Sequence, residues 1–595
     1  MRTETAHLPL AEGTDDLARL TPEALAHTIP SRLVGEGQGG GSVFSFVRTH
    51  AIPLQLTAVS AFIALAAIVR FRGLPGTGPV AYDEGWAPAN GRFLVTFLTH
   101  PGEWAGLLHR QFHLFVFGND GKIAHDLGLG SLLAAGVSPE NLTWYSALAG
   151  IVMAVVLAAL AWRRWGAAAA AVAGVFGAAV PLSVIYGHLL AAEADSLAAL
   201  SVLLYLLDRW WDRRPSLRLM ALTLLAFVAT LTLNYRLAPV LLALALVAGY
   251  LGLRSRGRLH QLRPSSTWLI TLCLTPALAM TAAYLLVLVA DVFHVHVPAA
   301  VHHLLRSGGT PVPFAFPDFY PRTLWDFAGP VAVIVTAIAI VVLLWNRRRL
   351  DPLAATACGG LLGSFLFFSA VHDKAPRAMA VCVPFAALVV ARAVSLPHIS
   401  LPHWGQARTI SLPLWGKAGW GQWMVAGLIC AAVLVSGWTS QSAQAISGTG
   451  QAGRWLAERP GTIVASRAPV FTLYTERNWD LVAGPTRAHA MAPLTTASTI
   501  ASLRQEGARW VVVDAHALLI EQSPAFRQLM ACGTPSAEFS DSASWAPRPF
   551  LEEADTLHLD YGGILRLRDQ LLASVGGAQT IRIYDLNGAG TAGCQ

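Results

Sequence analysis

Apolar residues in this 595-residue chain come in long, uninterrupted blocks. A helix needs about 20 apolar residues to cross the hydrocarbon core of a bilayer. About eleven blocks approach that length, so we expect each of them to form a membrane-spanning helix. The blocks are Ala51–Val69, Leu142–Trp162, Trp165–Gly187, Glu193–Trp211, Leu219–Tyr235, Leu237–Leu253, Ser266–Ala290, Phe327–Trp345, Leu353–Val371, Ala378–Leu396 and Trp423–Thr439.

The segments before and between the first blocks are polar. Residues 1–50 contain a Gly- and Ser-rich stretch typical of a flexible linker, so we expect a disordered tail without a cleavable signal peptide. Within the long segment 70–141, Leu107–Phe117 and Leu127–Val137 are apolar but too short to span. We expect these two stretches to be helices that lie along the membrane surface.

The last part of the chain, 440–595, has a different pattern. Short β-branched and aromatic runs predict strands at Thr462–Ala465, Trp510–Val513 and Thr580–Tyr584. Helical spacing occurs between them, at 498–507 and 526–531. The predicted fold is therefore an all-α membrane domain over 51–439 followed by a small soluble α/β domain. No Gly-rich phosphate loop opens its helices, so we assign it no nucleotide site.

Composition excludes a soluble enzyme. Hydrophobic residues make up 54% of the chain and charged residues 13%, whereas soluble proteins carry about 25% charged residues. The net charge of +7 does not indicate a nucleic-acid partner, because the arginines cluster in short loops beside the apolar blocks. The expected environment is a lipid bilayer.

Basic loops alternate along the chain. They are 163–164, 209–218, 254–263, 347–349 and the loop with Arg392, Arg408 and Lys417. The positive-inside rule places all of them, with the N-terminus, in the cytoplasm. Segments 70–141, 188–195, 291–326 and 372–377, and everything after about Ser440, then face the periplasm, so we expect a multi-pass inner-membrane protein. Cys532 and Cys594 lie in that last segment, where an oxidising environment would permit their pairing.

Two acidic pairs lie at outward ends of the predicted spans, and such groups are expensive near a membrane. Asp83 and Glu84 are flanked by aromatic residues and could bind an acceptor hydroxyl and take its proton. The alternative is an ordinary acidic helix start in a solvated loop. The fourth span reaches bilayer length only if it begins near Glu193, which places Glu193 and Asp195 at its outer N-terminus. Simple capping by Asp195 is the alternative there.

Two tight outward turns carry positive charge against the sidedness rule. One contains Tyr235 and Arg236, and the other contains His372, Lys374 and Arg377. An anionic headgroup at the membrane surface would explain them, since Arg offers a fork and Lys a point charge to phosphate oxygens. Ordinary flanking of the spans is the alternative.

Histidines crowd one outward loop, at His294, His296, His302 and His303. They lack the neighbouring cysteines or acids of a zinc site, so we assign no metal there. His302 and His303 are candidates for contact with an acceptor or headgroup, and an ordinary interfacial loop is the alternative.

This layout resembles the GT-C superfamily of membrane glycosyltransferases, in particular the branch of protein O-mannosyltransferases and lipid A aminoarabinose transferases. Four stretches carry the resemblance, namely Tyr82–Glu84, Pro181–Asp195, Lys374–Pro384 and Leu473–Arg477. One departure is that the second acidic motif is shifted to Glu193-Ala-Asp195, with His188 where many relatives have Arg.

The resemblance implies an inverting hexosyl or pentosyl transferase that uses a polyprenyl-phosphate sugar at the periplasmic face. The lipid tail would lie between spans, with its phosphate on Arg236, Lys374 and Arg377. Asp83 would act as base, while Glu84 and Glu193 or Asp195 would position the sugar or the acceptor. The acceptor would be a glycan, a lipid or a protein. Many relatives work without a metal. We therefore assign no cofactor, and a requirement for a divalent metal stays open.

Two other classes of function fit parts of the pattern. A secondary transporter would place charges near mid-membrane and show internal repeats, whereas here the charges lie at outer ends. A non-enzymatic membrane scaffold would not gather acids opposite cations.

Overall fold

The structure is a computed structural model. It describes residues 41–74, 79, 82–103, 122–212, 216–245, 316–346, 350–371, 374–396, 399–401, 410–412, 420–440, 446–475, 499–521, 523–554, 557 and 559–594. The chain divides into two compact units, Met1–Gln55 and Leu56–Gln595. Everything described below, apart from the first turns of one helix, belongs to the second unit.

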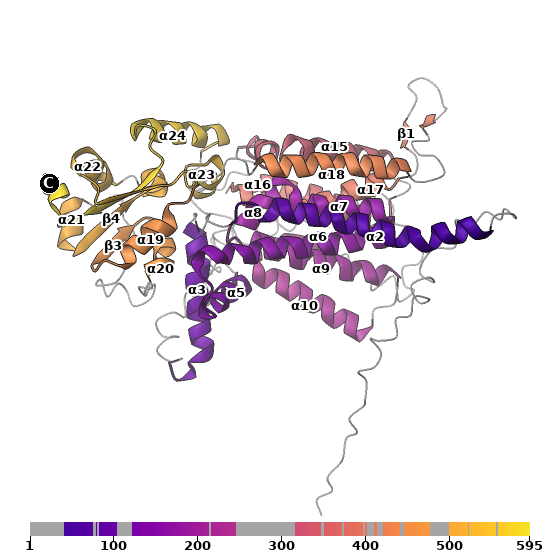
Figure 1. Ribbon diagram of the computed structural model, residues 1–595, viewed down its shortest axis with the longest axis horizontal. Helices are drawn as coiled ribbons and strands as arrows, with labels where there is room; N and C mark the ends of the chain where they lie inside the picture. The colour runs from indigo at the N-terminus through magenta and orange to yellow at the C-terminus, as the bar shows by residue number, and fades with distance from the viewer. Residues whose placement is uncertain are drawn as a thin grey trace, which may run out of the picture. The chain divides into compact units, whose positions relative to one another are not determined.

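Helices dominate the chain as far as residue 440 (Figure 1). The α-helices are α2 (Gly41–Phe71), α3 (Tyr82–Thr99), α5 (Ile123–Ala134), α6 (Thr143–Trp165), α7 (Ala167–Ala179), α8 (Pro181–His188), α9 (Glu193–Asp212), α10 (Leu217–Leu233), α14 (Phe319–Thr323), α15 (Pro330–Trp345), α16 (Pro352–Ala370), α17 (Cys382–Val394) and α18 (Trp420–Ser440). Shorter elements are η1 (Pro101–Glu103), η3 (Pro139–Leu142), η4 (Tyr235–Leu237), the π-helix η5 (Leu324–Ala328), η7 (Pro376–Val381) and the paired strands β1 (Ile399–Leu401) and β2 (Ile410–Leu412).

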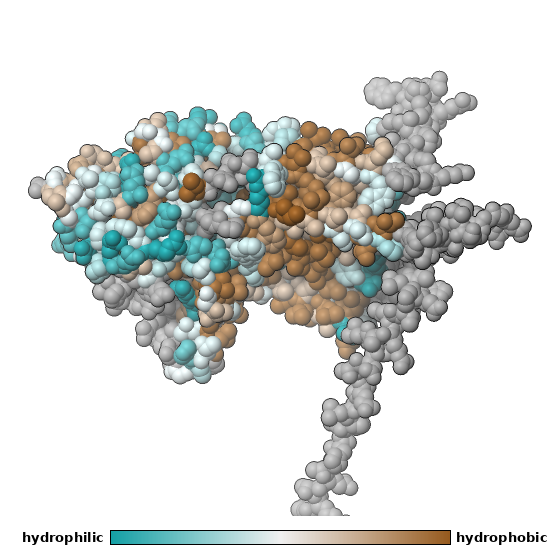
Figure 2. Space-filling model, in the orientation of Figure 1, coloured by the Kyte–Doolittle hydropathy of each residue, from teal (hydrophilic) through white to brown (hydrophobic). Residues whose placement is uncertain are grey.

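Several of these helices are long and apolar enough to cross a membrane. Among the described residues there are five, or seven if each of two bent pairs counts as one span. Figure 2 shows hydrophobic surface over the helical part of the visible face, as lipid contact requires. The chain is therefore a polytopic membrane protein. Part of the sixth predicted span and all of the seventh lie outside the described residues, so the total of eleven stays a prediction.

The predicted spans 165–187 and 327–345 are bent in the structure. The first consists of α7 and α8, which meet at 47° at Pro181. The second joins residues 319–328 to α15 at 114°, where Gly329 adopts a φ of 85° and Pro330 follows. A proline has no backbone N–H to donate, which favours a new helix start over continuation. Both bends therefore coincide with prolines inside apolar blocks.

Helix α7 lies in the centre of the bundle. It is rich in alanine, and all its residues are buried as it packs against α6, α17 and α18. Small side chains let helices approach closely in a membrane. A Cβ atom on Gly437 of α18 would come within 2.2 Å of the Ala179 carbonyl oxygen, so these two helices are in backbone contact.

Ion pairs join the basic ends of four helices. Arg163 and Arg164, at the end of α6, both contact the Asp208 carboxylate of α9, the latter at 2.7 Å. At the start of α16, Asp351 accepts a hydrogen bond from Trp165 and lies 3.1 Å from Arg392 of α17. These ends therefore meet at one end of the bundle, as the alternation of basic loops predicts.

The chain after residue 446 carries a four-stranded sheet in the order β3-β4-β6-β5. Its strands are β3 (Thr462–Ala465), β4 (Ala508–Val513), β5 (Ala537–Ser540) and β6 (Thr580–Asp585), and only β3 and β4 are parallel. The helical elements are α19 (Thr449–Ala457), α20 (Ala468–Thr475), α21 (Ile500–Gln505), η8 (Ala517–Glu521), α22 (Pro524–Cys532), α23 (Pro547–Glu553), α24 (Tyr561–Ser574) and η10 (Ala589–Thr591). We call 446–594 the C-terminal region.

The sheet has helices on both faces. Helices α21 and α22 pack their apolar residues on one side of the strands, and α19 and α20 pack on the other. The three strands predicted from the sequence are confirmed, as are the helical segments near 498–507 and 526–531.

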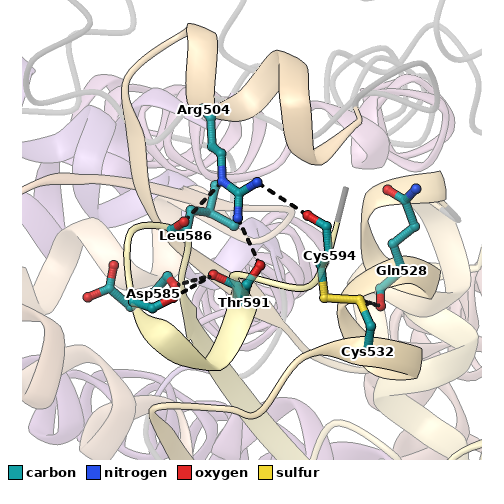
Figure 3. The surroundings of a disulfide bond; sticks show 8 residues. Arg504, Gln528, Cys532, Asp585, Leu586, Thr591 and Cys594 are labelled. Carbon is teal, nitrogen blue, oxygen red and sulfur yellow. Dashed lines mark hydrogen bonds between the residues drawn. A yellow bond between two sulfur atoms is a disulfide. The ribbon is translucent and has the colours of Figure 1, made fainter.

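A disulfide fixes the end of this region. Cys532 at the end of α22 is bonded to Cys594, and their Cα atoms are 5.7 Å apart. Figure 3 shows the Arg504 guanidinium beside this bond, where it donates to the carbonyl oxygens of Leu586, Thr591 and Cys594. The pairing that the sequence left open is thus present.

Two local predictions differ from the structure. The sequence predicts a tail that extends to residue 50, but α2 begins at Gly41. The apolar residues at 43–44 and 46–47 continue the apolar run of the first span upstream of residue 51. The second short apolar stretch is the helix α5, which begins at Ile123 rather than near Leu127. The first stretch, 107–117, lies outside the described residues.

Candidate functional site

The α8–α9 connection is the centre of the candidate site. It lies at the end of the bundle opposite the basic ion pairs, because α9 begins here and ends at Asp212. Glu84, in the first turn of α3, is 2% exposed, and its Oε1 accepts the Leu190 backbone N–H at 2.7 Å. The first acidic motif is thereby tied to the start of the second. Asp83 is in the same turn, but its side chain lies outside the described part of the chain.

Helix α3 is also held from its other side. A Cβ atom on Gly85 would come within 2.2 Å of the Val470 backbone nitrogen in α20, so the two backbones are in contact and only glycine fits. The start of α3 therefore lies between the α8–α9 connection and the C-terminal region. Tyr474 of the same α20 is buried, and burial together with the charges of Glu140 and Glu84 raises its pKa.

Asp195 has two partners that sequence reasoning missed. Its Oδ2 lies 2.8 Å from Nδ1 of His125 in α5 and accepts the Tyr145 hydroxyl at 3.0 Å, while Oδ1 accepts the Ser196 N–H at 2.9 Å. Burial lowers the pKa of His125, but the Asp195 carboxylate outweighs this effect, and the net pKa is raised. His125 lies in a polar outer segment, where a single histidine attracts no attention. The structure makes Asp195 part of a buried hydrogen-bonded group rather than a simple cap.

Tyr186, near the end of α8, is connected to the turn that carries Arg377. Its hydroxyl hydrogen-bonds to Oε1 of Glu552 in α23, and Glu193 lies within electrostatic reach of it. The same Glu552 oxygen accepts the Arg377 backbone N–H at 2.9 Å, and its Oε2 lies 3.5 Å from Arg377 Nε. The structure therefore links α8 to the Arg377 turn through Tyr186 and Glu552, two residues that the sequence did not single out.

Lys374 is buried beside Arg377. Its Nζ donates to the carbonyl oxygens of Phe368 and Ser369, at 3.1 and 2.6 Å, and of Val371, and lies 5.2 Å from the ring centroid of Tyr320. The ammonium group thus satisfies the last carbonyl oxygens of α16. Its contact with a phosphate stays a prediction.

The structure gives less information on the other candidate residues for substrate binding. Tyr235 and Arg236 form η4, where the Asn234 side chain accepts the Arg236 N–H at 3.1 Å. Their contact with a ligand stays a prediction. His302, His303 and His372 lie outside the described residues.

An apolar cavity of about 210 Å³ adjoins the cationic turn. It is bounded by η5 and α15, by α7, α16 and α17, and by Met379 of η7, the element that also carries Arg377. Its walls include Phe176, Leu324, Val333 and Cys382. An apolar chain could lie here with a polar end directed toward the turn.

The part of the chain that the structure describes contains no group of three His, Cys, Asp or Glu side chains placed to hold a metal ion.

Comparison with solved structures returns ArnT from Cupriavidus metallidurans. The apo structure is 14% identical, with a TM-score of 0.48, and the alignment covers 78% of this chain and 94% of that one. The structure bound to undecaprenyl phosphate is 14% identical, with a TM-score of 0.46 and coverages of 90% and 98%.

No protein-family model matches the sequence, and no curated protein matches it. We therefore derive the function below from the chain's own residues.

Proposed function

We propose that this protein is a GT-C-type, inverting glycosyltransferase that moves a sugar from a polyprenyl phosphate to an acceptor at the periplasmic face of the inner membrane. The observation that carries the proposal is the convergence of acids and a cation beside the apolar cavity. Glu84 contacts the α8–α9 connection, α9 begins there with Glu193 and Asp195, and Tyr186 of α8 reaches Arg377 through Glu552.

The arrangement suits transfer from a lipid phosphate. The prenyl chain would occupy the cavity between α7, α15 and α17, with its phosphate at the Arg377 turn. A fixed guanidinium stabilises the charge that develops on the phosphate when the anomeric carbon–oxygen bond breaks. Lys374 would support this turn by capping α16, and its direct contact with the phosphate stays part of the proposal.

The carboxylates near the α8–α9 connection would activate the acceptor. A carboxylate removes the proton from the acceptor nucleophile as that nucleophile attacks the anomeric carbon from the face opposite the phosphate. Asp83 is our candidate for this base, because Glu84 already accepts the Leu190 N–H and is thereby fixed in place. Glu193 and Asp195 would position the sugar or the acceptor.

The periplasmic side is supported by the disulfide. Disulfides persist in oxidising compartments such as the periplasm and are rare in the cytosol. The Cys532–Cys594 bond lies in the C-terminal region, whose Glu552 contacts the site. Both would therefore lie on the same, outer side.

Binding and transfer test the proposal separately. Purified full-length protein should bind undecaprenyl phosphate more tightly than undecaprenol, which lacks the phosphate. Arg377→Ala should weaken binding of the phosphate lipid by about tenfold, whereas Arg322→Ala, which removes a more exposed cation on α14, should not. Equal binding of the two lipids by the wild-type protein would contradict the proposed donor.

Transfer requires the base as well. Supplied with lipid-linked sugars and a mixture of envelope acceptors, the wild-type protein should consume one of the donors. Asp83→Asn should abolish that consumption, about 10²-fold or more for loss of a general base, while lipid binding is kept. Full activity of Asp83→Asn would remove Asp83 from the role of base.

A further inference from the structure

Helix α23 of the C-terminal region presents side chains in two directions. Arg548 and Glu552, one helical turn apart, both face the membrane helices: the Arg548 guanidinium lies 5.5 Å from the Phe327 ring centroid, and Glu552 contacts Tyr186 and Arg377. The next residue, Glu553, lies 3.0 Å from Nε2 of His516 inside the C-terminal region. Of these two adjacent acids, Glu552 therefore contacts the candidate site and Glu553 contacts the interior of the C-terminal region.

Glu552 holds two elements of the candidate site at once. One oxygen is shared by the Tyr186 hydroxyl and the Arg377 backbone N–H, and the other lies beside the Arg377 guanidinium. The Glu552 side chain is 9% exposed and that of Arg377 is 13% exposed. Salt and water screen such a pair weakly, so the carboxylate holds the Arg377 backbone by a hydrogen bond and attracts its side chain by charge.

A guanidinium has five N–H groups in one plane. Glu552 Oε2 lies 3.5 Å from Arg377 Nε without hydrogen-bond geometry, so this carboxylate attracts the guanidinium by charge. Because Glu552 also bonds the Arg377 backbone, it fixes the first turn of η7, which continues into the wall of the apolar cavity at Met379. Glu552 of the C-terminal region thus helps to set where Arg377 lies relative to the cavity.

We infer that Glu552 is a positioning residue of the donor site, which holds Arg377 and Tyr186 where a lipid phosphate would be bound. This inference rests on the proposed function. It gives the C-terminal region a defined part in the site, because the membrane helices alone do not contain the carboxylate that orients the cation.

A double-mutant cycle tests whether Glu552 acts through Arg377. Glu552→Gln keeps an acceptor for Tyr186 and for the backbone N–H but loses the charge beside the guanidinium. We expect this variant to raise the apparent Kd for undecaprenyl phosphate about tenfold, the size expected for one charged contact. The double variant with Arg377→Gln should bind no more weakly than Arg377→Gln alone.

Glu553→Gln is the matched control, since it changes the neighbouring acid on the same helix but not the contact with Arg377. It should leave the Kd at the wild-type value, even if its loss of the His516 contact lowers the melting temperature. An unchanged Kd for Glu552→Gln, additive losses in the double variant, or an equal loss with Glu553→Gln would overturn the inference.

Amide hydrogen exchange provides a readout that needs no ligand. In Glu552→Ala, the peptide that covers 376–381 should exchange faster than in the wild type, whereas in Glu553→Gln it should not. Unchanged exchange there overturns the inference. Faster exchange in a protein that binds no lipid phosphate would instead contradict the proposed function, so the two failures can be told apart.

Discussion

Arg70 is a fully buried cation near the end of α2. Its guanidinium donates to the carbonyl oxygens of Ala147 and Ala178, at 2.9 and 3.2 Å, and to the Ser183 hydroxyl at 2.9 Å. A buried charge is costly unless such groups surround it. Arg70 therefore links α2 to α6, α7 and α8 directly behind the candidate site.

Two glycines make room for this guanidinium. A Cβ atom on Gly150 would lie 1.9 Å from Arg70 Cζ, and one on Gly187 would lie 2.4 Å from Nη2. We predict that Gly150→Ala lowers the free energy of unfolding by about 1–3 kcal/mol, because the cation must move. The melting temperature in detergent is the measurement. Gly427→Ala, in α18 with nothing within 4 Å of the added carbon, should show no loss, and equal behaviour of the two variants would contradict the prediction.

The pair of His125 and Asp195 makes stability depend on pH. Burial opposes the charge on His125, but the carboxylate raises its pKa above 6.5. The stabilisation is therefore complete below that value and is lost as the pH rises through the raised pKa. Asp195→Asn should lower the melting temperature more at about pH 6 than at about pH 9. Tyr145→Phe removes the hydrogen bond from the Tyr145 hydroxyl to Asp195 and should cost the same at both pH values.

At the scale of elements, the bend at Gly329 positions the segment that carries Tyr320 and part of the cavity wall. Gly329→Ala would place a carbon 2.8 Å from Ser436 Oγ, in a left-handed backbone conformation. We predict a loss of stability beyond the roughly 1–2 kcal/mol of backbone strain alone, together with weaker binding of undecaprenyl phosphate. Gly73→Ala also has a positive φ, of 81°, but nothing lies within 4 Å of its added carbon, so it tests a positive-φ substitution without the Ser436 contact. Identical losses would show that the Ser436 contact is unimportant.

Elements with a strong local pattern could be predicted from the sequence. Apolar blocks give the spans, and β-branched runs give β3, β4 and β6. The strand β5, with Glu538 and Ser540 exposed at its edge, has no such run. The bends at Pro181 and Gly329 also escaped prediction, because an apolar block reads the same whether its helix is straight or broken. Pairing across the sheet depends on contacts distant in sequence and leaves no local trace.

The same reasoning explains which candidate residues the sequence singles out. Glu84, Glu193 and Asp195 stand out because charges are rare in an apolar chain. Glu552 lies among many charged residues of the C-terminal region, and His125 lies in a polar outer segment, so neither is conspicuous. Only the fold shows that Glu552 meets Arg377 and that His125 meets Asp195.

At the scale of the whole molecule, the ion pairs at one end and the candidate site at the other divide the protein into two sides. We predict that a membrane-impermeant maleimide labels Arg566→Cys, on the exposed surface of α24, in cells whose inner membrane is intact. Leu217→Cys, at the opposite end on the exposed start of α10, should react only after permeabilisation. Cys358, Cys382 and Cys430 are buried and give little background. Labelling in the reverse order would invert the proposed orientation.

The position of Glu552 near the end of the chain has a consequence for biosynthesis. A nascent polypeptide inserts its helices first, so its arginine turn would form before the carboxylate that orients it has been translated. A nascent chain that has inserted its helices therefore still lacks the carboxylate that contacts the Arg377 turn.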